Sequence, residues 1–173
     1  MKKNTRVVLE MPGTIKTEEV PIPYPAPDEV LIEVKCVGIC GSDVHCFESG
    51  PFIPPSDPNQ AIGLGHECAG VVVEVAAHVK KLSVGDRVCI EPGVPCGNCR
   101  FCREGRYNLC LKMDFMATHP NYRGALQNYI THPESMTFRL PDSVSYTEGA
   151  LVEPAAIGIH AAMLAGWLRA TES

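Results

Sequence analysis

Four cysteines crowded into fifteen residues constrain this chain more than any other feature of its sequence. Cys96, Cys99, Cys102 and Cys110 follow the spacing C-x2-C-x2-C-x7-C. This spacing lets one lobe of chain, predicted at residues 93–112, surround a single tetrahedral ion with four thiolates. Because protein atoms would fill all four positions, we expect a structural zinc that holds the lobe together. A disulfide pair or an iron–sulfur cluster is an alternative interpretation of the same cysteines.

The same lobe is rich in basic residues. Four thiolates around a divalent cation leave two surplus negative charges, and Arg100, Arg103, Arg106 and Lys112 lie within or beside the lobe to offset them. A solvated surface is an equally good interpretation of these side chains. The basic residues therefore add nothing decisive to the metal prediction.

Outside the lobe, short segments with period-two alternation predict a mainly β domain. The clearest segment is 30–36, and further strands are expected at 70–75, 87–90 and 125–130. Gly85 and Asp86 form the predicted turn before the third of these strands. Short strands with long connections favour a partly open barrel.

The pattern changes to helical after Pro141. Ser145, followed three residues later by Glu148, is typical of a capping box, and residues 146–166 are Ala-rich. Pro154 is expected to kink or restart this helix.

Composition limits the class of partner. The chain has 173 residues and a net charge of -5 at pH 7, which suits one folded domain. Lys and Arg are interspersed with Asp and Glu, so we expect no basic face and no nucleic-acid partner. No segment resembles a signal peptide or a bilayer span, so no membrane partner is expected and the cytoplasm is the predicted location.

A second set of metal ligands lies apart from the lobe. Cys40 supplies a thiolate, His66 an imidazole and Glu67 a carboxylate. Catalytic zinc uses such mixed sets when one position stays open for water or substrate. Each residue alone is more often structural, because single cysteines and histidines are common in protein cores.

The order of these motifs resembles that of the zinc-dependent medium-chain dehydrogenases, with the sorbitol, xylitol and related polyol enzymes as the most similar branch. The motifs are residues 38–45, residues 65–67, the cysteine lobe and the pair Glu153-Pro154. The resemblance implies a chaperonin-10 (GroES)-like barrel over residues 1–153, with residues 154–173 as the start of a linking helix and an unmatched tail. It also implies NAD or NADP as cosubstrate, a small-molecule alcohol or polyol as substrate, and a homo-oligomer.

The resemblance assigns roles around a catalytic zinc. Cys40 and His66 would bind the ion, and Glu67 would be the third ligand or a carboxylate that exchanges with water. Glu153 would lie beside the ion and hold its water. Asp43 would hydrogen-bond the far nitrogen of His66 and so fix its tautomer.

It also assigns a proton path and a substrate cleft. Ser42 would accept the proton of the substrate hydroxyl, and His45 would pass it outward. The positions of Cys46 and Phe47 should line the cleft, and aromatic residues are frequent there in polyol enzymes. Phe115 and Met116 are further cleft candidates, with core packing as the alternative.

No G-x-G-x-x-G turn for a dinucleotide occurs in the chain, so the Rossmann domain of the family is predicted to be absent from it. Residues 167–173 do not resemble the family. We therefore expect a catalytic domain that cannot oxidise an alcohol unaided. A zinc module or remnant without enzymatic activity is the alternative.

Overall fold

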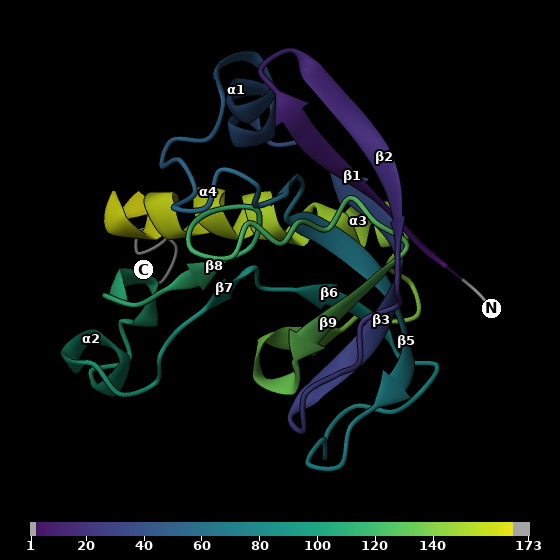
Figure 1. Ribbon diagram of the computed structural model, residues 1–173. Coiled ribbons are helices and arrows are strands. Elements are labelled where there is room, and N and C mark those ends of the chain that lie inside the picture. Colours follow the sequence, from purple (N-terminus) through teal and green to yellow (C-terminus); the bar gives the residue numbers. More distant parts are fainter. Residues whose placement is uncertain (1–2, 168–173) are drawn as a thin grey trace.

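A curled five-stranded antiparallel sheet forms the body of the molecule, whose residues 3–167 are described by a computed structural model (Figure 1). In spatial order its strands are β10 (Thr137–Arg139), β6 (Arg87–Ile90), β5 (Glu67–Val75), β3 (Glu29–Gly38) and β9 (Tyr129–Pro133). Each neighbouring pair is antiparallel. Among the described strands β10 does not pair with β9, so the sheet is the predicted partly open barrel.

The main hydrophobic core packs against this sheet. Val30 and Ile32 of β3 are fully buried and pack with Val72, Val88 and Ile130 from the neighbouring strands. β-Branched side chains suit such a pleated, buried surface. The core therefore holds β3 and β5 together, and the predicted mixed ligands lie at the far end of this pair, where Gly38 is paired with Glu67.

Three of the four predicted strands are confirmed. The prediction for residues 125–130 is wrong in its first half, because β9 begins only at Tyr129. The backbone N–H groups of Ala125 and Leu126 instead bond to Gly65 and Leu64, at 2.7 and 2.9 Å. The segment before β9 thus braces the chain that carries His66.

A smaller sheet contains β1 (Asn4–Met11), β2 (Thr14–Val20) and β4 (Ile62–Gly63), in the order β2-β1-β4. Gly13 makes the β1–β2 turn with a φ of 79°, a value that glycine adopts without strain. Its N–H donates to the Phe47 carbonyl at 2.6 Å, so the hairpin tip holds the end of a helix, as Figure 1 shows. The alternation pattern did not reveal this hairpin, because almost all of β2 is exposed.

The cysteine lobe projects from the sheet (Figure 1). It contains β7 (Gly93–Val94), helix α2 (Arg100–Arg103) and a 3-10 turn (Tyr107–Leu109), and β8 (Asp114–Phe115) follows it. β7 pairs with β8 and closes the base of the lobe.

The remaining helices are α1 (Gly41–Ser49), α3 (Tyr146–Ala150) and α4 (Val152–Leu164), with a 3-10 turn at Glu134–Met136. The Ser145–Glu148 capping box is present at the start of α3. The helix restarts at Val152, which places Pro154 in the first turn of α4, where it removes no intrahelical hydrogen bond.

No residue of α4 is buried, and its exposed apolar side chains include Ile157, Ile159, Met163 and Leu164. Among the described residues, no helix combines the length and apolar character needed to cross a membrane. Most of the tail predicted to be unmatched, residues 168–173, lies outside the described residues.

Candidate metal centres and substrate cleft

The four lobe sulfurs lie close enough to share one ion. The Sγ atom of Cys99 is 3.4 Å from that of Cys102 and 4.0 Å from that of Cys110, and Cys96 and Cys102 are 4.0 Å apart. Sulfurs bound at about 2.3 Å to a tetrahedral zinc lie about 3.8 Å apart. The geometry therefore fits a single zinc ion and leaves no room for a multi-iron cluster. The structure shows all nine cysteines free, with no S–S bond among these four sulfurs.

Backbone N–H groups point at these sulfurs. The N–H of Cys96 donates to Sγ of Cys110 at 3.3 Å. Hydrogen bonds from the backbone of Cys102 and Leu111 lower the pKa of Cys99 to about 6. Because the thiolate is the form that binds metal, these bonds favour the metal-binding state of Cys99.

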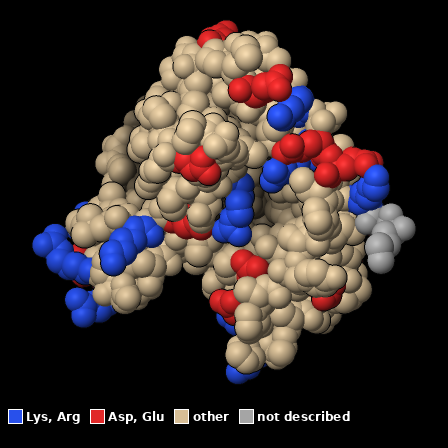
Figure 2. Space-filling model, viewed as in Figure 1, with Lys and Arg blue, Asp and Glu red and all other residues tan. Residues whose placement is uncertain are grey.

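Basic side chains gather on the lobe (Figure 2). Arg100 and Arg106 pair with Glu104 at 3.4 and 3.9 Å, and both guanidinium groups lie over the ring of Phe101. Both arginines are largely exposed, so these pairs contribute little to stability. Their contacts fit the solvated-surface interpretation.

The mixed ligands meet at the end of the barrel. Cys40 is the N-cap residue of α1, two residues after β3 ends, and His66 immediately precedes Glu67, the first residue of β5. Each offers one ligand atom, and the three atoms lie within 4.8 Å of one another. His66 and Glu67 are buried, and Cys40 lies at the positive end of a helix dipole. We refer to this group as the mixed-ligand site.

Asp43 connects the two segments of this site. Its Oδ1 atom accepts a hydrogen bond from the Gly65 N–H at 2.7 Å, and its Oδ2 atom accepts one from the Cys40 N–H at 3.0 Å. These bonds replace the predicted hydrogen bond to His66, which the described residues do not show. The carboxylate holds the ligands through their backbone instead of through the imidazole.

Gly38 makes room for the third ligand. A Cβ atom at this position would lie 2.2 Å from Oε2 of Glu67, well inside contact distance. The glycine therefore leaves the space that the Glu67 carboxylate fills. This cradle supports the fit of the site to a metal ion.

The fourth predicted ligand, Glu153, lies outside this group of ligand atoms. It is in the first turn of α4, where burial raises its pKa. The charge of His66 opposes that rise, and those of Glu67 and Glu91 add to it. Glu153 is therefore close enough for the charges of His66 and Glu67 to change its pKa, but it lies beside the group of ligand atoms.

A cavity of about 420 Å³ opens beside the mixed-ligand site, and we call it the cleft. Ser42, Asp43 and His66 line its metal side. The other walls are mostly apolar and consist of Cys46, Pro51, Phe52, Ile53, Leu64, Cys110, Leu111, Met113, Ala117, Thr118, His119 and Tyr122. Sequence reasoning missed most of these walls, because no alternation or motif marks the long segments that form them.

Ser42 and His45 lie one helical turn apart on α1. Ser42 lines the cleft, and His45 stacks on Phe52, with ring centroids 4.0 Å apart and an angle of 7° between the planes. No hydrogen bond joins Ser42 to His45 in the part of the chain that the structure describes.

Only one of the other predicted cleft residues lines the cleft. Cys46 lines the cleft and Phe47 does not. Phe115 packs its ring edge against His66, with centroids 5.4 Å apart, so it supports a ligand instead of the substrate space. For Met116 the cleft prediction is wrong, because it packs against the core and lines a separate cavity.

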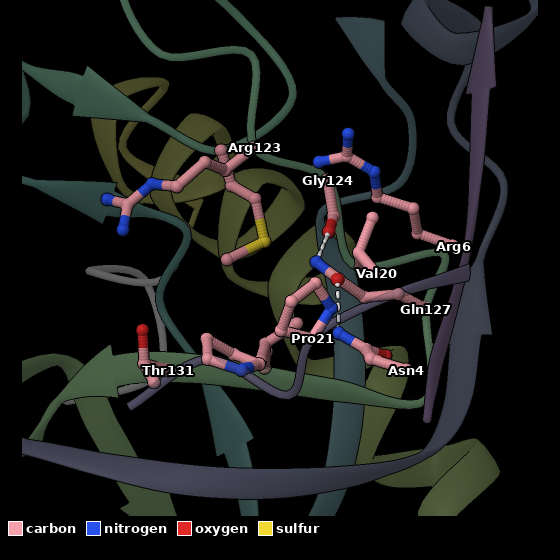
Figure 3. Close-up of a pocket in the computed structure, with 11 residues that line it drawn as sticks. Asn4, Arg6, Val20, Pro21, Arg123, Gly124, Gln127 and Thr131 are labelled. Carbon is pink, nitrogen blue, oxygen red and sulfur yellow. Dashed lines mark hydrogen bonds between the residues drawn. The ribbon is translucent and has the colours of Figure 1, made fainter. Parts of the chain in front are cut away.

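That separate cavity has a volume of about 230 Å³ (Figure 3). The Asn4 amide donates to Gln127 at 2.9 Å, and the Gln127 amide donates to the Gly124 carbonyl at 2.6 Å. Arg6, at its edge, pairs with Glu18 at 2.7 Å. These polar groups bond to one another and fasten β1 to the segment before β9, which indicates a structural role.

A family model described as the alcohol dehydrogenase GroES-like domain matches residues 26–142. The chain belongs to this family. The family and the fold class predicted from the motifs are therefore confirmed. A zinc-type alcohol dehydrogenase-like protein of Escherichia coli K12 is 67% identical over 163 residues, which cover 94% of this chain and 47% of that protein. The sorbitol dehydrogenase of Bacillus subtilis is 48% identical over 157 residues, or 86% of this chain and 41% of the enzyme.

Solved structures of this family agree. An oxidoreductase/dehydrogenase of unknown specificity from Escherichia coli superimposes with a TM-score of 0.94 at 65% identity, covering 95% of this chain and 48% of that one. A zinc-binding dehydrogenase from Sinorhizobium meliloti, bound to NADP, gives a TM-score of 0.82 at 34% identity, covering 95% and 46%. The chain spans about half the length of the relatives it matches.

Proposed function

We propose that this GroES-like domain is the substrate-activating half of a zinc-dependent dehydrogenase that oxidises a secondary alcohol of a sugar alcohol to a ketone with NAD or NADP. One observation carries the proposal. Cys40, His66 and Glu67 gather a thiolate, an imidazole and a carboxylate beside a cleft of about 420 Å³ that Ser42 also lines. A module with a purely structural metal would need neither the open ligand set nor the hydroxyl.

The chemistry requires a proton and a hydride to leave the alcohol. An aliphatic hydroxyl has a pKa of about 16, close to that of water, so it seldom ionises at neutral pH. When bound, zinc supplies Lewis-acid polarisation of the hydroxyl, and the nicotinamide accepts the hydride. The protein must therefore hold the ion, remove the proton and orient the carbon.

Residues of this chain divide those tasks. Cys40, His66 and Glu67 hold the ion, and Asp43 fixes their backbone. Ser42 faces the cleft, where it would accept the hydroxyl proton and donate its own proton to His45, which would release it to solvent. Glu153, beside the site, holds a water molecule there.

No dinucleotide-binding turn occurs in this chain, so we propose that the isolated domain binds an alcohol but does not oxidise it. We further propose that the complete enzyme is a homo-oligomer. Rapid oxidation of sorbitol by the purified chain with NAD would contradict the proposed division of labour.

The direct test uses metal content and a spectroscopic metal. The purified chain should bind two zinc ions, and Cys40→Ser should remove one of them. With cobalt in the mixed-ligand site, addition of xylitol should change the visible spectrum, because the alcohol enters the coordination sphere. Cys36→Ser, a change outside both clusters, is the control and should keep both ions. Two ions with no spectral response to any polyol would favour the non-enzymatic zinc module.

A further inference from the structure

Residues 51–61 form a loop between α1 and β4 that lies against His45. Phe52 lies flat on the imidazole, with centroids 4.0 Å apart and an angle of 7° between the rings. Phe52 also lines the cleft, while the residue as a whole remains 71% exposed. An aromatic ring this exposed needs something else to hold it in place.

Tyr122 provides one such tie. Its side chain is buried, and its hydroxyl donates a hydrogen bond to the backbone carbonyl of Ile53, the residue after Phe52. The Tyr122 carbonyl accepts from the Gly63 N–H at 2.8 Å, so its backbone is anchored to β4. Tyr122 has a φ of 50°, an uncommon value for a residue with a bulky side chain. Such conformations persist where the surroundings enforce them and are frequent near functional sites.

A second tie lies at the other end of the loop. The Gln60 amide donates to the carbonyl groups of Pro120 and Asn121, at 3.2 and 3.1 Å. The loop is therefore fastened at both ends to residues 117–124, the segment that supplies another wall of the cleft.

We propose that Phe52 and Tyr122 are positioning residues for His45. Tyr122 holds Ile53, which keeps Phe52 stacked on the imidazole and restricts His45 to one side-chain orientation. This inference rests on the proposed proton path for its functional meaning. Without the stack, the imidazole on α1 would sample several rotamers.

The contacts explain why the loop needs no secondary structure of its own. The Tyr122 hydroxyl donates to a backbone carbonyl of the loop, and the Gln60 amide of the loop donates to two backbone carbonyls of residues 117–124. These hydrogen bonds set the position of the loop. The same contacts close the cleft wall. Orientation of the proton carrier and the shape of the substrate space therefore depend on one set of hydrogen bonds.

Nuclear magnetic resonance of the zinc-loaded chain with labelled histidine tests the placement without any turnover. The ring protons of His45, assigned with His45→Gln, should be shifted upfield of those of the exposed His78 and His160, because Phe52 lies over the ring. Phe52→Leu should abolish this shift, and Tyr122→Phe should reduce it, since only the hydroxyl is lost. Phe47→Leu, on the same helix, is the matched control and should leave the His45 signals unchanged.

Unchanged His45 signals in Phe52→Leu, or in a folded Tyr122→Phe, would overturn the inference. If Tyr122→Phe does not fold, Gln60→Ala removes the other tie and should reduce the shift in the same direction; no change there would overturn it equally. Failure of the proposed function would appear elsewhere, as a cobalt spectrum that no polyol alters, so the two outcomes are distinguishable.

Discussion

The two candidate metal centres differ in how the chain builds them. The lobe takes all four sulfurs from residues 96–110, and local turns alone bring them within 4.0 Å along three of their pairs. The mixed-ligand site takes Cys40 from the end of β3 and His66 and Glu67 from the start of β5. The lobe site depends on sequence spacing, and the mixed-ligand site depends on the barrel.

Because of this difference, the two sites should depend on the barrel fold to different degrees. A closed site of four protein ligands can stabilise a small lobe by itself, as structural zinc does elsewhere. The mixed-ligand site needs the β3–β5 register, the glycine at position 38 and the Asp43 cross-link before its atoms converge. Damage to the barrel should therefore reach the mixed-ligand site, whereas damage to the lobe should stay local.

The largest expected effect is loss of the lobe metal. Cys99→Ser should remove one zinc ion and release the fold of residues 93–112, because apparent binding energies of structural zinc reach about 10 kcal/mol. Hydrogen exchange should rise sharply in the lobe and stay low in β3 and β5. Cys36→Ser is the control for a cysteine outside the clusters. Equal loss of protection in the barrel would show that the two centres are not independent.

Removal of the Asp43 carboxylate, which bonds to both ligand-bearing segments, should have the next largest effect on stability. Asp43→Ala removes a buried carboxylate together with the two hydrogen bonds that it accepts, each worth about 2 kcal/mol. The free energy of unfolding should therefore fall by about 4 kcal/mol. Urea denaturation measures this loss. Asp43→Asn keeps one acceptor and should lose about half as much. The lobe zinc should remain bound in both variants, and its release would contradict the comparison.

Acid should weaken the junction between barrel and lobe. His132 donates to the Glu91 carbonyl at 2.8 Å, just before β7, and burial lowers its pKa to about 4. The unfolded chain, with a histidine pKa of about 6.5, binds the proton first, so stability is full above pH 6.5 and falls by about 3 kcal/mol toward pH 4. Denaturation at a series of pH values should show this slope. His132→Gln should flatten it, and an unchanged slope would assign the acid sensitivity to other groups.

The smallest effect expected is a local change at the third ligand. Gly38→Ala places a methyl group where the Glu67 carboxylate lies and should weaken metal binding at the mixed-ligand site about tenfold. Gly41→Ala, at a nearby glycine with open space around it, should not. Competition with a chelator gives both affinities. If Gly38→Ala also weakened metal binding by the lobe, the two sites would not be independent.

Much of the fold could be predicted from local patterns. The alternation at residues 30–36 and the capping box at Ser145 each report a local preference, and β3 and α3 lie where they indicate. β2 was not predicted, because an almost fully exposed strand has no buried face and therefore shows no alternation of apolar and polar residues. β9 begins late because hydrogen bonds to Gly65 and Leu64 take the residues before it.

The sites divide in the same way. The lobe is local, so its spacing alone predicts it. The mixed ligands could be suggested only by their resemblance to known motifs, because nothing in the spacing of Cys40 and His66 brings them together. The partner of Asp43 could not be predicted, since a side chain that caps Cys40 can also reach Gly65 only after β3 and β5 have paired. The cleft walls from residues 51–53 and 117–119 depend on tertiary contacts of Tyr122, and no pattern in the sequence indicated them.

Asp43 also couples metal affinity to folding. Because one carboxylate bonds to both ligand-bearing segments, neither segment can move away without breaking a bond to the other. The mixed-ligand site should therefore assemble in an all-or-none manner, with few chains holding only part of it. By linkage, a metal concentration one hundred times the dissociation constant would add about 2.7 kcal/mol to the stability of the whole barrel. Loss of the ion would in turn make the chain easier to unfold and degrade, so metal supply would control the amount of folded protein.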